Sequence, residues 1–342
     1  MRIHKLWIGL TAIIVIGIVS WIVLHDRPNH TQPLKVLVIF QEDEARILLE
    51  KFKQQENQPY EMIRMASGEA SYQLLTMNQS DIDVVLGGPA DLHEQLKLNN
   101  KLLKYAPKNS DQIADAYKDD DKYWTGIYTG PLAIGINIEA WEQDEELSSL
   151  PYPETYEDLL IEPLRGKLDI PNPETSGTGY TLLASLEQER GMDEAIELLY
   201  KLKKHSRAVH FSGITSAQRL AMGEAPVAIS FLGDQLRFAS SGYGIHSIIP
   251  PNAGWEIGAA SILKTSNNRG AAKKLVDYML SNDAQTYYMN TAFSIPVETN
   301  IKLNEKLQNV EMGHILADYS FDVAAAKRQA LLGAWKNKLS AE

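Results

Sequence analysis

The sequence predicts a two-lobed α/β protein that follows one N-terminal transmembrane helix. Three observations support this fold class. Residues 6–24 form an uncharged apolar stretch, and short apolar runs then alternate with helical patterns in two successive series. Two apolar, glycine-containing strands, at 123–137 and 257–263, lie at the ends of these series. We expect them to cross between two lobes as hinge strands.

Composition is consistent with a folded, acidic protein. The chain has 342 residues, which suits about two domains, and 44% are hydrophobic and 23% charged. The formal net charge of -11 argues against nucleic acid as a partner. The chain has no cysteine, which excludes disulfides, cysteine-ligated metals and a lipid-modified N-terminal cysteine.

The apolar stretch at 6–24 is long enough to span a bilayer as one helix. Arg2 and Lys5 precede it, which places the N-terminus in the cytoplasm and the rest of the chain outside. A cleaved signal peptide is the alternative, but no A-x-A site follows and the apolar run is long for such a peptide. We therefore expect residues 1–33 to be an uncleaved membrane anchor with a short polar tether.

The first lobe is predicted from three strand–helix units followed by a crossing strand. Each strand ends in a turn where a ligand of an α/β sheet binds. The expected strands are 35–40, 60–65 and 83–86, and the expected helices are 42–55, 67–78 and one beginning near Asp91.

The second lobe repeats this pattern and the chain then returns to the first. Its predicted limits are 131–257, and those of the first lobe are 34–130 plus 258–342. The expected strands are 167–170, 208–211, 226–232 and 245–249, and the expected helices begin near Tyr180, Met192, Ser212 and Asp234, with further helices at 269–280, 283–290 and in the tail.

Small polar turns follow the strands of both lobes. The most distinctive is Ser176–Gly179, where a serine or threonine can cap the next helix and the helix N-terminus favours an anion. One such turn alone is as consistent with an ordinary helix cap as with an anion-binding site. Five turns divided between two lobes favour two helix-terminus surfaces that face each other across a cleft. They are Ser67-Gly68, Gly87-Gly88, Ser176–Gly179, Ser212-Gly213 and Gly233-Asp234.

The sequence carries no signature of an enzyme, and we predict neither a catalytic site nor a cofactor. The histidines are not in metal-ligand spacing, and neither a G-x-S-x-G elbow nor a G-x-x-x-x-G-K-[ST] loop occurs. The pair Glu42 and Glu44 is typical of a solvated helix face. Tyr287 and Tyr288 lie in a helical stretch where adjacent side chains do not share a face, so we expect core or surface roles rather than iron ligation.

Five segments carry a resemblance to a known family. They are LGGPAD (86–91), YWTGIYTGPLAIGIN (123–137), IPNPETSGTGYTLLASL (170–186), AMGEAPVAISFLGDQL (221–236) and the region 242–260. In this order they resemble type II extracytoplasmic solute-binding proteins of ABC importers, in the branch for ferric iron, 2-aminoethylphosphonate and sugar phosphates. The resemblance covers roughly residues 35–296.

The resemblance implies two lobes that close on a solute, with the ligand-binding residues in the cleft. Ser176 and Thr178 would hold a phosphate or phosphonate with backbone N–H groups, and Asp234 and Glu256 would accept hydroxyls or an amine. The positions carried over from the family pattern are Ser67, Gly68, Ala90, Ser176, Gly177, Thr178, Ser212, Gly213, Asp234 and Glu256.

Two departures from the family pattern bear on the solute. The paired tyrosines of the ferric-iron binders are not found in the second lobe's cleft loops, and Gly233 stands where related proteins often have a histidine. We therefore expect a membrane-anchored binding component of an ABC importer for a small anionic solute that carries a phosphate or phosphonate. The alternatives are a solute-sensing co-receptor for a two-component sensor kinase, a ferric-iron binder and, with least support, an enzyme on the same fold.

Overall fold

The structure is a computed structural model that describes residues 32–76, 81–308, 310 and 314–341. The predicted transmembrane helix at 6–24 lies outside the described residues. In the part of the chain that is described, no helix has the length and apolar character needed to cross a bilayer. Everything that follows concerns the unit Leu34–Glu342.

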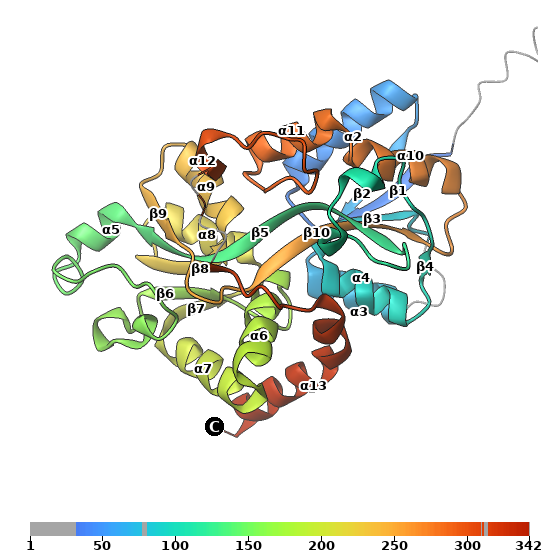
Figure 1. Cartoon of the computed structure of the whole chain (residues 1–342). Coiled ribbons are helices and arrows are strands. Elements are labelled where there is room, and N and C mark those ends of the chain that lie inside the picture. Colours follow the sequence, from blue (N-terminus) through green and yellow to red (C-terminus); the bar gives the residue numbers. More distant parts are fainter. Residues whose placement is uncertain (1–31, 77–80, 309, 311–313, 342) are drawn as a thin grey trace, which may run out of the picture. The chain divides into compact units, whose positions relative to one another are not determined.

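A single long strand, β5 (Trp124–Asn137), connects two halves of the sheet (Figure 1). Its first part, up to Pro131, pairs antiparallel with β10 (Trp255–Leu263). Its second part, from Leu132, pairs antiparallel with β8 (Val227–Phe231). The predicted crossing strand therefore changes partners at Pro131. The described residues give one ten-stranded sheet with the order β2-β1-β3-β10-β5-β8-β6-β7, β4 and β9 lying off this path.

The first lobe has a mixed sheet. β1 pairs parallel with β2 and β3, while β10 pairs antiparallel with β3, β4 and β5. Because β10 stays in this sheet, the chain returns from the second lobe in the segment just before it. The remaining elements are β1 (Leu34–Val38), α2 (Glu42–Glu56), β2 (Tyr60–Arg64), α3 (Ser67–Thr76), β3 (Val84–Pro89), α4 (Ala90–Leu98), β4 (Leu102–Leu103), two 3₁₀ turns (Ser110–Gln112 and Asp115–Tyr117), α10 (Arg269–Met279), α11 (Asn282–Thr291) and α12 (Glu305–Gln308).

The second lobe has parallel strands β6, β7 and β8 beside β5 and the antiparallel strand β9. Helices α6 and α7 carry its largest buried face, which includes fully buried Tyr180. The elements are α5 (Ile138–Gln143), two 3₁₀ turns (Asp158–Leu160 and Glu162–Leu164), β6 (Leu168–Pro171), α6 (Gly177–Arg190), α7 (Met192–His205), β7 (Ser206–His210), α8 (Gly213–Ala221), α9 (Leu232–Ser240) and β9 (Ile245–Ile248).

The C-terminal helix α13 (Phe321–Ser340) contacts both lobes. Its Arg328 lies 2.9 Å from the buried carboxylate of Asp91 on α4 and stacks over the ring of Tyr180 on α6. The Tyr180 hydroxyl in turn donates to the carbonyl of Ala324 at 2.6 Å. The contacts of this helix with both lobes do not assign it to either one. The lobe limits 34–130 plus 258–342 and 131–257 therefore remain a prediction.

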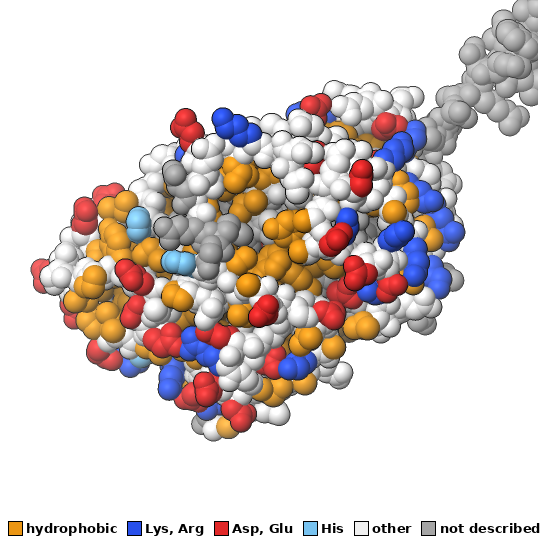
Figure 2. Space-filling model, viewed as in Figure 1, with side chains coloured by type: hydrophobic (Ala, Val, Ile, Leu, Met, Phe, Trp, Pro, Cys, Tyr) orange, Lys and Arg blue, Asp and Glu red, His pale blue; other side chains and the backbone are white. Residues whose placement is uncertain are grey.

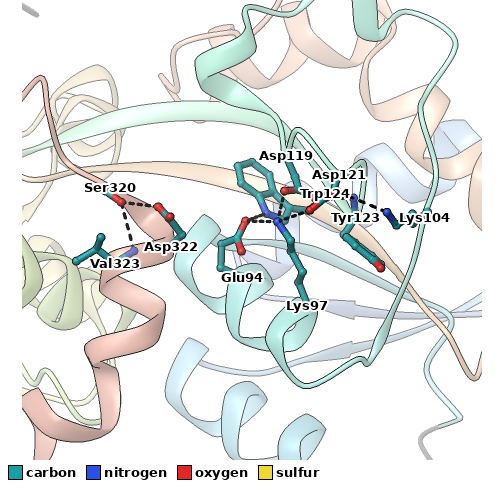
Figure 3. Close-up of polar contacts among 10 residues, drawn as sticks. All are labelled: Glu94, Lys97, Lys104, Asp119, Asp121, Tyr123, Trp124, Ser320, Asp322 and Val323. Carbon is teal, nitrogen blue, oxygen red and sulfur yellow. Dashed lines mark hydrogen bonds and ion pairs between the residues drawn. The ribbon is translucent and has the colours of Figure 1, made fainter.

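A polar network holds α4 to the start of β5 (Figure 3). Lys97 of α4 contacts three carboxylates, those of Glu94, Asp119 and Asp121. The Trp124 indole N–H donates to Glu94 at 2.7 Å. Glu94 and Asp119 are buried, so the lysine offsets the cost of removing these two charges from water.

The surface carries charges of both signs (Figure 2). On the face drawn, basic side chains gather over the first-lobe edge near β4, with acidic side chains beside them. The view therefore contains no continuous basic stripe of the kind that follows a nucleic-acid backbone.

Candidate functional site

One cavity, of about 90 Å³, lies at the carboxyl ends of the parallel strands, between the two lobes. This is where an open α/β sheet places a ligand, because strand ends and helix N-termini meet there. Its lining comes from turns that follow β1, β2, β3, β6, β7 and β8, from β5 and β10, and from α11.

Eight of the ten site residues expected from the sequence line this cavity. They are Ser67, Ser176, Gly177, Thr178, Ser212, Gly213, Asp234 and Glu256. Gly68 and Ala90 are not among the lining residues. Gly68 instead donates its N–H to the carbonyl of Thr175 at 3.2 Å, and Ala90 is fully buried in the core. The Gly68–Thr175 bond joins the two lobes, so the structure is a closed form.

Three helix N-termini meet at one end of the cavity. α3 begins at Ser67, α6 at Gly177 and α8 at Gly213. Ser176 caps α6 by accepting the N–H of Gly179 at 3.4 Å, whereas Ser212 makes no side-chain cap bond for α8. The partial positive charge of three helix N-termini therefore acts on the same space.

Two glycines allow these turns to approach each other closely. A Cβ atom on Gly177 would lie 2.6 Å from the Ser67 hydroxyl oxygen, and one on Gly213 would lie 2.1 Å from the Thr178 hydroxyl oxygen. Both distances are far below van der Waals contact. Glycine is therefore required at these positions if turns from both lobes are to surround one small group.

Arg64, at the end of β2, adds a full positive charge to the lining of the cavity. Its Nε lies 3.5 Å from the Phe40 carbonyl oxygen. The guanidinium also lowers the pKa of Asp234, although burial outweighs this effect.

Three carboxyl groups, those of Glu44, Asp234 and Glu256, form a second cluster in the cavity lining, which we call the carboxylate end. Burial raises the pKa of Glu44 to about 8, against the influence of Arg237. Burial raises the pKa of Asp234 to about 6 in the same way. Burial and the nearby carboxyls of Asp234 and Asp91 raise the pKa of Glu256 well above its usual range. This end can accept hydrogen bonds from hydroxyl or ammonium groups.

Aromatic rings close the cavity on one side. The rings of Tyr128 and Tyr288 stack with centroids 4.8 Å apart, and Phe40 packs edge-on against Tyr288 at 5.2 Å. Tyr128 fits because Gly258 has no side chain: a Cβ there would lie 2.0 Å from the tyrosine ring. Burial raises the pKa values of both tyrosines well above 10, and neighbouring carboxyls add to the effect.

Sequence reasoning missed several lining residues. The expectation that Glu44 lies on a solvated helix face is wrong, because it is only 6% exposed and faces the cavity. Tyr288 is buried as expected, but it also lines the site. Arg64 had one usable signal, its place at the last position of a strand and three residues before the Ser67 turn. Within the described residues, no group of histidine and acidic side chains is arranged to hold a metal ion.

Comparisons with known proteins agree with this architecture. The profile of the family described as bacterial extracellular solute-binding protein matches residues 80–323. An uncharacterized protein of Haemophilus influenzae is 30% identical over 266 residues, which cover 75% of this chain and 76% of the relative.

Solved structures of binding proteins superpose on most of the chain. The periplasmic binding protein AfuA of Actinobacillus pleuropneumoniae, with exogenous fructose-6-phosphate bound, matches with a TM-score of 0.84 and 26% identity over 91% of this chain and 99% of that one. The periplasmic binding protein P5PA matches with a TM-score of 0.81 and 25% identity, covering 89% and 98%. A ferric binding protein of Campylobacter jejuni, at 18% identity over 89% and 98% and a TM-score of 0.75, shares the fold.

The profile match covers more than half of the chain, and the fold and the position of the cavity agree with it. The chain therefore belongs to the bacterial extracellular solute-binding proteins, in the type II branch that includes proteins for sugar phosphates and ferric iron.

Proposed function

We propose that this protein is the extracytoplasmic binding component of an ABC importer and that its cavity holds a small solute with a phosphate or phosphonate group. The observation that carries the proposal is the meeting of the N-termini of α3, α6 and α8 at one end of one cavity. A tetrahedral oxyanion can accept N–H and hydroxyl hydrogen bonds from all three.

The anion would bind among Ser67, Ser176, Thr178 and Ser212, with backbone N–H groups of Gly177 and Gly213. Arg64 supplies the charge that neutral donors lack and favours a dianion at this end. The residues come from both lobes, so the anion itself would bridge the lobes and stabilise the closed form.

The rest of the solute would face Glu44, Asp234 and Glu256. Carboxyl groups with raised pKa values interact well with hydroxyls, because each can accept or donate a hydrogen bond. Fructose 6-phosphate, seen in the structurally similar AfuA, has both a phosphate and a chain of hydroxyls. It is the first compound to test.

A cavity-filling variant tests the proposal. Gly130 lines the cavity, and a Cβ on it would meet nothing within 4 Å. Gly130→Leu therefore adds a side chain to the cavity wall at a position where its Cβ meets no neighbouring atom. The matched control is Gly270→Leu, on the exposed first turn of α10, where a Cβ also meets nothing.

Calorimetric titration of residues 34–342 would use fructose 6-phosphate, 2-aminoethylphosphonate, inorganic phosphate and Fe³⁺. The proposal expects heat with at least one phosphorus compound, lost in Gly130→Leu and kept in Gly270→Leu. Heat with Fe³⁺ alone would replace it with the ferric-iron role. The absence of heat with every compound would refute it.

The partner is the second part of the proposal. Family membership supports an ABC permease in the membrane that the predicted anchor at 6–24 would also occupy. Affinity purification from membranes would test this: a permease is the expected partner, whereas a sensor kinase in its place would favour the co-receptor role.

A further inference from the structure

A single arginine links the two lobes at the rim of the cavity. We propose that Arg237 is a positioning residue of the solute site: it holds Glu44 in place from the opposite lobe, so that the carboxylate end of the site is complete only when the lobes are closed. This inference rests on the proposed function of the cavity.

Arg237 lies on α9 of the second lobe and reaches two consecutive residues of α2 in the first lobe. Its Nη1 is 3.1 Å from Glu44 Oε1, and its Nη2 is 2.5 Å from Asp43 Oδ2. One guanidinium therefore bonds both carboxylates across the cleft. We refer to Arg237, Asp43 and Glu44 together as the interlobe clasp.

Glu44 separates two cavities, which explains why Arg237 acts through it rather than on the solute. Glu44 lines the inner cavity and also a second, outer cavity at the cleft rim. Arg237 lines the outer cavity and is absent from the residues that line the inner one. The arginine thus approaches Glu44 from the outside while the solute would approach it from the inside.

Gly233 brings α9 close enough for this contact. A Cβ on Gly233 would lie 2.9 Å from the carbonyl oxygen of Ala292 at the end of α11, in the first lobe. Phe293, which follows Ala292, has a φ of 51°, which is unusual for a residue with a side chain. The close approach at Gly233 lies one helical turn before Arg237, so it places that side chain over α2.

Arg237 is also the charged group that favours the carboxylate form of Glu44. Burial favours the neutral form of Glu44, as do Asp43 on its own helix and Asp234 on α9. Among the charged groups that act on it, Arg237 alone favours the carboxylate. The other titratable groups that interact with Glu44 are phenols, from Tyr128 on β5 and from Tyr287 and Tyr288 on α11.

The first test measures affinity for fructose 6-phosphate with the full chain in detergent. Arg237→Gln should weaken binding about tenfold, and Arg237→Lys should restore part of the loss. Arg219→Gln is the matched control, because Arg219 pairs with Glu224 within the second lobe. The pH profile of affinity between about pH 6 and pH 9 should also differ between Arg237→Gln and the wild type. The reason is that the pKa of Glu44 rises when the arginine is lost. Unchanged affinity together with an unchanged pH profile would overturn the proposal.

The second test needs no solute and so separates this proposal from the proposed function. The chain has no cysteine, so fluorophores can be attached at exposed sites in each lobe through Gln54→Cys and Met222→Cys. Raising the salt concentration from about 0.05 M to about 1 M screens the exposed Arg237–Asp43 pair of the clasp and should lengthen the distance between lobes in the wild type. In Arg237→Gln the distance should no longer respond to salt. Equal responses in both proteins would refute the clasp even if the cavity binds fructose 6-phosphate.

Discussion

Replacing Glu44 with glutamine should change how the stability of the solute-free protein depends on pH. The folded protein holds the Glu44 proton up to a pKa of about 8, whereas the unfolded chain releases it near 4.5. A group whose pKa is raised by folding contributes stability below the unfolded value, and this contribution is lost as the pH rises through the folded value. Wild-type protein should therefore lose stability between about pH 5 and pH 8.

The size of this loss follows from the two pKa values. Each pKa unit corresponds to about 1.4 kcal/mol, so Glu44 alone should account for about 3–4 kcal/mol between about pH 5 and pH 8. Its side chain is only 7% exposed, so solvent screening reduces this value little. Glu44→Gln removes the titration and should remove this part of the pH dependence.

Urea unfolding of residues 34–342 at several pH values measures the difference directly. Asp234 and Asp91 titrate in the same direction, so the informative quantity is the wild-type slope minus the variant slope. Glu145→Gln, at an exposed position, is the control and should keep the wild-type slope. If Glu44→Gln also keeps it, Glu44 is not buried in the solute-free protein and the account of the carboxylate end is wrong.

Three further predictions concern buried polar groups. Burial lowers the pKa of His93 to about 4, so the unfolded state gains a proton first as the pH falls. The free energy of unfolding should therefore drop by about 3 kcal/mol between about pH 6.5 and pH 4. In urea unfolding, His93→Gln should abolish that drop. Asp91→Asn leaves Arg328 buried without its carboxylate and should cost about 3–5 kcal/mol by calorimetry; a loss below about 1 kcal/mol would contradict this. Lys97→Met leaves two buried carboxylates facing each other (Figure 3) and should lower the free energy of unfolding by about 2–4 kcal/mol. Lys104→Met, at an exposed pair, is the control and should change it by less than about 0.5 kcal/mol in thermal unfolding.

The fold was predictable because each element carries a local signal. Apolar runs with turns at their ends predicted most strands within one or two residues, and the apolar run 123–137 became β5 almost unchanged. The exceptions are β3, which continues three residues past its predicted end, and the short strand β4, which was not predicted. Most predicted helix starts also lie within two residues of those observed, and α6 is an exception. α6 begins at Gly177 and not near Tyr180, because Ser176 rather than a later residue provides the cap.

The half of the cavity formed by helix N-termini was predictable for the same reason. Serine and glycine after a strand form a local pattern, and the lobes then bring several copies of it together. The other half depends on contacts between residues far apart in the chain. Glu44 looks like part of an ordinary acidic first helical turn, and only the closed lobes bury it between Arg237 and the cavity. Tyr288 has no local signal of a site, since its role requires the ring of Tyr128, 160 positions earlier in the sequence, to stack on it.

This division suggests how the site separates affinity from selectivity. In the proposed site, the helix N-termini would recognise an oxyanion with backbone groups, which any solute of that class can use. The carboxylate end is built from side chains whose protonation depends on neighbours in both lobes, so it completes only around a solute that lets the lobes close. A solute with the anion but without groups to satisfy Glu44, Asp234 and Glu256 leaves buried polar groups unpaired, which costs affinity. Inorganic phosphate should therefore bind more weakly than a phosphorylated polyol, and the clasp at Arg237 should matter for the polyol more than for phosphate.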